Sequence, residues 1–278
     1  MQWMGRRESS NAEEGSSSGG GRMALGGGVL GIIGVIIYLF TGVNPTQLLQ
    51  GGEGQGGGQK NTKLTESKSK EQSFARVVLA DTEDTWNKLF RDMGQTYQEP
   101  TIHFFEEKVE TSGCGFAGEA SGPFYCPADK KVYIDLSFFT ELDQRFGAAG
   151  DFAQAYVIAH EVGHHVQKLL GVSDKMQRAR EQLSEEEYNK LSVKLELQAD
   201  FYAGVWAHYQ QQRGLVDPGD IDEALNAANA IGDDRLTQGR VSPDSFTHGT
   251  SAQRMFWFKK GYETGDVRQG DTFGSTEL

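Results

Sequence analysis

Two histidines and a glutamate at a short spacing are the residues of this chain best suited to chemistry. The run is His160-Glu161-Val162-Gly163-His164. Residues four apart lie one turn apart on the same face of an α-helix, so both imidazoles can reach one small cation. Glu161 lies about 100° around the helix from His160, where its carboxylate can reach a water beside that cation. The spacing predicts a Zn²⁺ site with Glu161 as its general base.

The third protein ligand must come from another part of the chain. A third histidine six residues after His164 would define one large class of zinc peptidases, but Leu170 stands there and Gln167 stands where that class has glycine. Glu196 and Asp200, in contrast, lie four residues apart on a later segment with helical character. Glu196 is therefore the candidate third ligand.

The residues around Glu196 support this assignment. They form a stripe of small side chains on the same helical face: Ser192, Ala199, Ala203 and Ala207. Such a stripe lets a second helix approach closely, and Gly163 between the two histidines would allow the same on the facing helix. Asp200 is then expected to accept the free ring N–H of a ligand histidine, His160. The competing interpretation is an ordinary solvated acidic face.

The remaining four histidines have three different expected roles. His208 lies about 120° from Glu196 on the same helical wheel and is a weaker ligand candidate. His165 and His103 are expected to be structural. His248 lies in a loop that enters a helix, where it and Arg254 are candidate donors to the oxyanion that forms during amide hydrolysis. The competing interpretation is an ordinary loop histidine and a surface arginine.

The elements that must position these residues have clear local signals. A helix is predicted from Asp151 to Gly171, and two capping boxes, beginning at Ser184 and at Thr250, open two later helices. Strands are predicted over Thr101–Val109 and Lys131–Phe138. Strands early in the chain and helices late in it predict an α+β fold.

The N-terminal quarter has a different composition from the rest. Residues 1–22 are polar and predicted to be disordered, and residues 23–43 carry no charge and are long enough for one transmembrane helix. A flexible linker is predicted over residues 44–73, followed by one domain over residues 74–278. Arg6, Arg7 and Arg22 precede the span, so the positive-inside rule predicts a cytoplasmic N-terminus and an extracytoplasmic domain.

Charge and cysteine content agree with that arrangement. The 278 residues carry a net charge of −12, which argues against a nucleic-acid-binding protein. The two cysteines, Cys114 and Cys126, are expected to form a disulfide in an oxidising compartment. They lack the spacing of a structural zinc site.

The motifs together resemble a known family. Residues 159–167 (AHEVGHHVQ), 195–208 (LELQADFYAGVWAH) and 248–266 resemble the bacterial neutral zinc metallopeptidases of the YpfJ type. The ligand pattern is similar to that of gluzincins, and His248 followed by Arg254 matches the spacing of a membrane-linked peptidase clan among them. The resemblance implies a zincin-like peptidase at the bacterial inner membrane.

The implied reaction is hydrolysis of peptide bonds in extracytoplasmic or membrane-proximal proteins, with protein or peptide as substrate. As zincins generally do, an extended substrate would pair with an edge strand, for which Lys131–Phe138 is the candidate. Two alternatives remain open: a catalytically silent, membrane-tethered binding or chaperone-like module, and a structural anchor with an accidental histidine motif. Mn²⁺ or Co²⁺ could also replace Zn²⁺.

Overall fold

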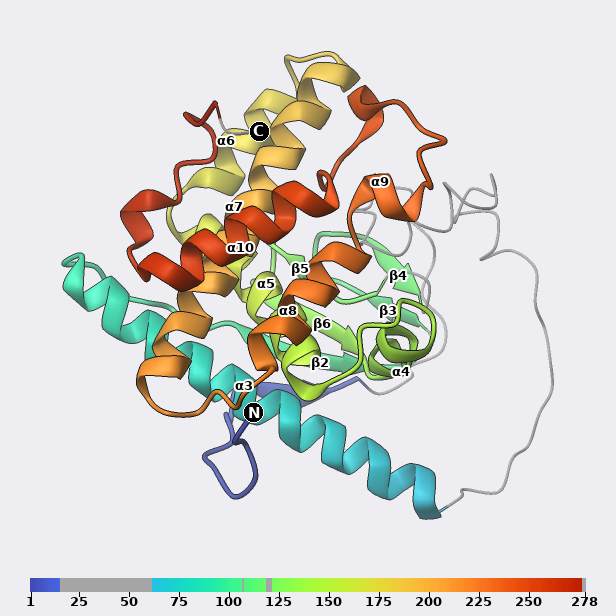
Figure 1. The fold of residues 1–278 in the computed structure, drawn as a ribbon, viewed down its shortest axis with the longest axis vertical. Helices are drawn as coiled ribbons and strands as arrows, with labels where there is room; N and C mark the ends of the chain where they lie inside the picture. The colour runs from blue at the N-terminus through green and yellow to red at the C-terminus, as the bar shows by residue number, and fades with distance from the viewer. Residues whose placement is uncertain (16–61, 107, 119–121, 277–278) are drawn as a thin grey trace.

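A computed structural model describes residues 1–15, 62–106, 108–118 and 122–276. These residues form an α+β fold in which helices pack on a small sheet (Figure 1). The fold class predicted from the sequence is confirmed at this level. The predicted transmembrane segment, residues 23–43, lies outside the described residues. Within the described ranges, every helix is too short or too polar to cross a membrane.

The main sheet has four strands in the order β1-β2-β6-β5. Strands β1, β2 and β6 run parallel to one another, and β5 runs antiparallel to β6. A separate hairpin is formed by β3 and β4. The bounds are β1 Ala12–Glu14, β2 Thr101–Phe105, β3 Lys108–Glu110, β4 Phe116–Gly118, β5 Phe124–Cys126 and β6 Lys131–Asp135.

The structure corrects the prediction of an edge strand over Lys131–Phe138. Strand β6 ends at Asp135 and lies between β2 and β5, so it is internal. Its Val132, Tyr133 and Ile134 are all buried, because an internal strand is covered on both faces. The edges of the described sheet are β1 and β5.

The helices carry most of the chain. Their bounds are α3 Thr62–Asp92, α4 Ser137–Gln144, α5 Asp151–Leu169, α6 Val172–Arg180, α7 Glu185–Gln212, α8 Asp220–Ala230, α9 Asp233–Leu236 and α10 Ser251–Thr264. Short 3₁₀ turns follow at η2 Pro243–Ser245 and η3 Val267–Gln269. Both predicted capping boxes are formed, at Ser184 with Glu187 and at Thr250 with Gln253. The local signals therefore located the starts of α7 and α10 correctly.

Helix α5 is the centre of the fold. It contacts α3, α7 and α8 as well as strands β5 and β6, and fourteen of its nineteen residues are buried. Gly163 lets α7 approach, because a Cβ at this position would lie 2.9 Å from the carbonyl oxygen of Ala199. The predicted close contact between Gly163 and the small stripe is thus confirmed.

Helix α7 also packs closely against α10 on its other side, again because glycines lie at the contact. A Cβ on Gly204 would lie 2.0 Å from the carbonyl oxygen of Phe258, and one on Gly261 would lie 2.1 Å from that of Phe201. Three helices are therefore stacked at backbone distance, in the order α5, α7, α10.

Residues 1–15 belong to this fold, so their predicted disorder is wrong. Strand β1 pairs with β2, and Arg6 and Arg7 form ion pairs with Asp81 and Glu83 of α3. The prediction failed because composition does not reveal partners more than seventy residues away in the chain. The predicted linker over residues 44–73 is wrong from Thr62 onward, where α3 begins.

The predicted disulfide between Cys114 and Cys126 is formed. It joins the turn between β3 and β4 to the end of β5. The cysteines lie in a small second cluster of buried residues with Phe105, Phe124 and Tyr133. The disulfide thereby fastens the β3–β4 hairpin to strand β5 of the main sheet.

Candidate metal centre

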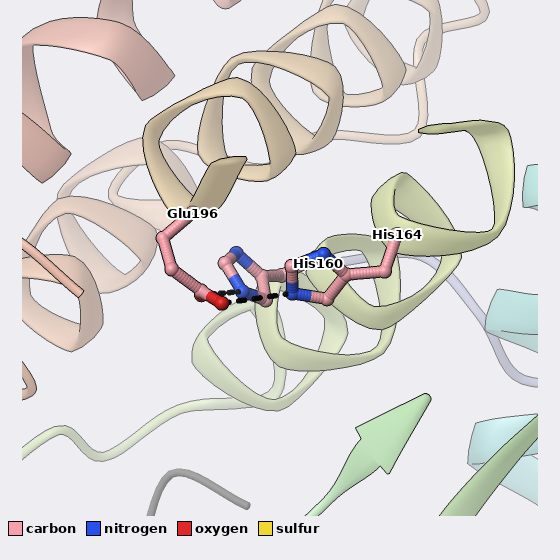
Figure 2. A group of neighbouring side chains, drawn as sticks. All are labelled: His160, His164 and Glu196. Carbon is pink, nitrogen blue, oxygen red and sulfur yellow. Dashed lines mark hydrogen bonds and ion pairs between the residues drawn. The ribbon is translucent and has the colours of Figure 1, made fainter. Parts of the chain in front are cut away.

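Helices α5 and α7 bring three potential ligands together. Figure 2 shows His160 and His164 from α5 facing Glu196 from α7. His160 Nε2 lies 3.1 Å from Glu196 Oε2, and His164 Nε2 lies 3.5 Å from Glu196 Oε1. One ligand atom from each residue lies within 4.8 Å of the others. The three residues that the sequence analysis selected as ligands are thus grouped by the fold.

These distances suit a tetrahedral cation. Bonds of about 2.0–2.1 Å in a tetrahedral site hold neighbouring ligand atoms about 3.3–3.4 Å apart. The 3.1 and 3.5 Å separations are close to that value, although they end on the two different carboxylate oxygens of Glu196, Oε2 for His160 and Oε1 for His164. Two imidazole nitrogens and one carboxylate form a donor set that Zn²⁺ favours, and they leave a fourth position for water.

The surroundings of His160 favour a positive charge at its ring. Its Nδ1 lies 2.8 Å from Asp200 Oδ1 while its Nε2 faces Glu196, so both ring nitrogens meet carboxylates. Burial lowers the pKa of His160, but the charge of Asp200 and the hydrogen bonds to both carboxylates outweigh it and raise the pKa to about 10. A cation at Nε2 would take the place of that proton.

Asp200 is the hub of a buried polar network. Its carboxylate accepts hydrogen bonds from Tyr156 Oη at 2.5 Å and from Arg254 Nε at 2.8 Å, besides its contact with His160. Burial raises the pKa of Asp200, but the positive charges of Arg254 and His160 outweigh it and lower the pKa to about 2. Asp200 therefore stays ionised and holds the His160 ring with its Nε2 toward Glu196, as the sequence analysis expected.

Arg254 lies behind this network. Its side chain is fully buried, and it donates to Asp200, to Tyr156 Oη at 3.3 Å and to the backbone oxygen of Ile231 at 3.3 Å. A side chain without exposed surface cannot touch a substrate in this conformation. The geometry favours a positioning role over the expected oxyanion contact.

His164 is oriented by a residue that the sequence analysis passed over. Its Nδ1 lies 2.8 Å from Gln167 Oε1, and Gln167 Nε2 donates to the backbone oxygen of Leu195 at 2.7 Å. Gln167 thus holds the second histidine and ties α5 to the turn of α7 that precedes Glu196. The available signal was its place three residues after His164, on the same helical face.

His248 reaches the same region from the loop before α10. Asp233 organises this loop, because its Oδ2 accepts the backbone N–H groups of Thr247, His248 and Gly249 at 2.8, 2.7 and 3.1 Å. Its Oδ1 lies 3.3 Å from His248 Nδ1. Burial lowers the pKa of His248, but Asp233 outweighs it, helped by the charge of Glu196, and the pKa is raised. His248 therefore lies within electrostatic range of the ligand carboxylate of Glu196.

Glu161 is buried at 2% exposure, and its side chain forms no hydrogen bond or ion pair within the described part of the chain. Burial raises the pKa of its carboxyl above the ordinary value, and the two ligand histidines oppose the shift. A carboxylate without competing partners, adjacent to His160, is available to a water molecule.

The other histidines have partners elsewhere. His165 Nδ1 lies 2.9 Å from Tyr125 Oη and its Nε2 lies 2.6 Å from the backbone oxygen of Gln98. His103 contacts Glu13, and His208 contacts the backbone oxygen of Tyr262. None of the three is part of the ligand cluster found among the described residues. The structural roles expected of His165 and His103 agree with these contacts, and the weaker ligand candidate His208 lies outside the cluster.

The chain is similar to known bacterial sequences. The family model described as "Putative neutral zinc metallopeptidase" matches residues 1–273. The "Uncharacterized protein YpfJ" of Escherichia coli K12 is 49% identical over 99% of this chain and 100% of its own length. "Uncharacterized protein Rv2575" of Mycobacterium tuberculosis H37Rv is 42% identical over 74% of this chain and 73% of its own. No solved structure matches significantly.

Proposed function

Because this chain belongs to the family described as "Putative neutral zinc metallopeptidase", we propose that it is a zinc-dependent endopeptidase. The observation that carries the proposal is the grouping of His160, His164 and Glu196 within 4.8 Å, beside a buried Glu161 whose side chain has no partner among the described residues. The resemblance in sequence supplies the reaction class, and the geometry supports the roles of individual residues.

Each residue has a distinct task in this proposal. The two histidines and Glu196 hold the metal, and the bound Zn²⁺ would polarise the scissile carbonyl and acidify a water molecule. Glu161 takes a proton from the attacking water and then delivers it to the leaving amine. A protonated His248 donates to the developing oxyanion. Arg254 acts indirectly, through Asp200.

An extended substrate would pair with β5 rather than with Lys131–Phe138, the segment predicted from the sequence. Strand β5 lies at one edge of the described sheet and packs against α5. Tyr125 of β5 contacts His165, the neighbour of a ligand histidine, so the edge strand has a fixed position relative to the metal centre. An extended peptide added to this edge would present its backbone to Glu161.

A cavity next to the centre is suited to a substrate side chain. Its volume is about 350 Å³, and it lies between α7, η2 and the start of α10. Val193, one turn before Glu196, and Gly249, next to His248, both line it; the other lining residues are Lys190, Lys194, Pro243, Phe246, Thr250 and Gln253. We assign it to an apolar substrate residue.

The disulfide supports an extracytoplasmic place of action. Disulfides persist in oxidising compartments and are rare in the bacterial cytoplasm. Cys114 and Cys126 are bonded at the edge of the proposed substrate strand. The substrates are therefore proposed to be extracytoplasmic or membrane-proximal proteins.

The substitution Glu161→Gln tests the reaction. It keeps the shape of the side chain and removes the base, so we expect one zinc per chain and a loss of peptidase activity of roughly 10²–10⁴-fold. Activity is measured on unfolded protein substrates and zinc by elemental analysis. Glu185→Gln, at an exposed position in the first turn of α7, is the matched control.

Three results would decide between the candidates. Full activity in Glu161→Gln would exclude the proposed base. A wild-type protein that binds zinc without cleaving any substrate would favour the silent binding module. Wild-type protein without zinc would exclude the metal centre itself.

A further inference from the structure

Residues 1–15, here called the N-terminal segment, form part of the folded domain. Strand β1 lies parallel to β2 in the register Ala12 to Ile102 and Glu14 to Phe104. The backbone continues this pairing, since Gly15 N donates to Phe104 O at 2.8 Å. In Figure 1 the segment, in blue, lies beside α3.

The first two arginines of the segment are bound by carboxylates of α3. Arg6 donates to both carboxylate oxygens of Asp81, at 2.7 and 2.5 Å. Arg7 lies 2.9 Å from Glu83 and 2.8 Å from Asp84. Two of the three charges that suggested a cytoplasmic N-terminus, those of Arg6 and Arg7, are thus part of the fold, where they neutralise acidic side chains of α3.

Glu83 depends on the N-terminal segment. It is 3% exposed, and its side-chain partners among the described residues all come from that segment: Arg7, Ser9 and Asn11. A buried carboxylate without partners is strongly unfavourable. The docked segment therefore supplies the hydrogen bonds and the positive charge that this buried carboxylate needs.

The segment also contacts the metal-binding part of the domain. The Met1 ammonium lies 2.7 Å from Asp151, the first residue of α5, and 3.2 Å from Asp220 of α8. Trp3 packs edge-on against Phe74 with ring centroids 5.4 Å apart. The docking surface extends from β2 across α3 to the start of the ligand helix.

We propose that the N-terminal segment and residues 62–276 lie on the same side of any membrane that this chain meets. A single crossing between them would separate them by a hydrocarbon core of about 30 Å, which the ion pairs and the strand pairing exclude. The arrangement expected from the sequence, a cytoplasmic N-terminus with an extracytoplasmic domain, is incompatible with these contacts.

Cross-linking of the full chain in intact cells tests this proposal. Ser73 Oγ donates to Glu8 Oε1 at 2.5 Å on the surface, so Glu8→Cys with Ser73→Cys places two thiols side by side. A short membrane-permeant bismaleimide should link them, while the native cysteines are bonded to each other. After denaturation, cyanogen bromide cleaves at Met4, Met23 and Met93, so residues 8 and 73 stay joined only if cross-linked.

The matched control is Glu8→Cys with Glu186→Cys. Arg213, after the end of α7, contacts Asp81 and Asp84, whereas Glu186 lies 27 residues earlier, about 40 Å away along the helix. This pair should give no link within one chain. The proposal predicts that most chains of the first pair, and few of the second, carry the link.

Each other outcome overturns the proposal. A link in detergent-purified protein but not in cells would show that a membrane separates the two segments. No link in either preparation would show that the segment does not dock. Because neither result depends on peptidase activity, failure of the proposed reaction remains a separate finding.

Discussion

At the scale of single residues, the two candidate metal-binding histidines are held differently. The Nδ1 of His160 contacts the ionised Asp200, whereas the Nδ1 of His164 contacts the neutral Gln167. Asp200 is in turn neutralised by Arg254, so a charged pair rather than a lone acid lies behind His160. Each ring is fixed with its Nε2 toward Glu196.

Loss of Asp200 should affect both stability and metal binding. Asp200→Ala leaves the guanidinium of Arg254 buried without its carboxylate, and breaking a buried pair costs about 3–5 kcal/mol. The free energy of unfolding in urea measures this effect. Tyr156→Phe removes one hydrogen bond to the same carboxylate and should cost less, about 1.5–3 kcal/mol. Equal losses in the two variants would contradict the central role of Asp200.

The pair of His248 and Asp233 should make stability depend on pH. The pKa of His248 is raised above 6.5, so its contribution is complete below pH 6.5 and is lost as the pH rises through the folded-state value. The pKa of Asp233 is lowered below 3.8, so its contribution is complete above pH 3.8 and is lost as the pH falls through the folded-state value.

An NMR titration of His248 checks this expectation. The wild-type imidazole should titrate above 6.5, and Asp233→Asn should lower its pKa. In unfolding experiments, the stability difference between wild type and His248→Gln should shrink as the pH rises above 6.5. A difference that stays constant from pH 6 to 10 would argue against the ion pair.

At the scale of elements, the centre depends on how closely three helices pack. The candidate ligands lie on α5 and α7, and α10 supplies Arg254 from the other side of α7. Gly163, Gly204 and Gly261 set the two helix separations. Side chains with a Cβ at these positions would push the helices apart, and with them the histidines and the carboxylate.

Gly204→Ala should therefore destabilise the protein even though alanine favours helices by about 1 kcal/mol. The new Cβ would lie 2.0 Å from a backbone oxygen of α10, which cannot move alone. We expect a net loss of about 1–3 kcal/mol in the free energy of unfolding. Gly163→Ala, with its nearest atom at 2.9 Å, should cost less. The reverse order would contradict this account of the packing.

At the scale of the whole molecule, the proposed metal links parts of the chain that are distant in sequence. It would join α5 to α7, and the polar contacts of Asp200 extend this link to α10. A ligand that binds the folded state alone raises the free energy of unfolding, by an amount that grows with the logarithm of its concentration over its dissociation constant. Metal binding should therefore stabilise the helical half as one unit.

Removal of the metal should lower the melting temperature. A chelator should shift the Tm of wild-type protein downward, and added Zn²⁺ should restore it. Glu196→Ala, which lacks one proposed ligand, should melt at the same temperature with or without chelator. Calorimetry measures these values. A wild-type Tm that does not respond to chelator or zinc would argue against a resident metal.

What could be predicted from the sequence was local. The histidine spacing and the two capping boxes each depend on residues within about one helical turn, and the small stripe around Glu196 on residues within about four. Periodicity relates such residues to each other without any knowledge of the fold. For this reason His160, Glu161, His164 and Glu196 were selected before their distances were known.

The tertiary structure alone decided the partners that lie far apart in the chain. The local sequence pattern does not reveal that Asp233 binds the His248 loop, that Tyr156 contacts Asp200, or that the N-terminal segment docks. Gln167 is close enough to His164 in the sequence to be noticed, but its role in orienting that histidine depends on its hydrogen bond to the backbone of α7. Hydrogen bonds and ion pairs between distant segments depend on how the elements pack, and packing is a property of the whole chain.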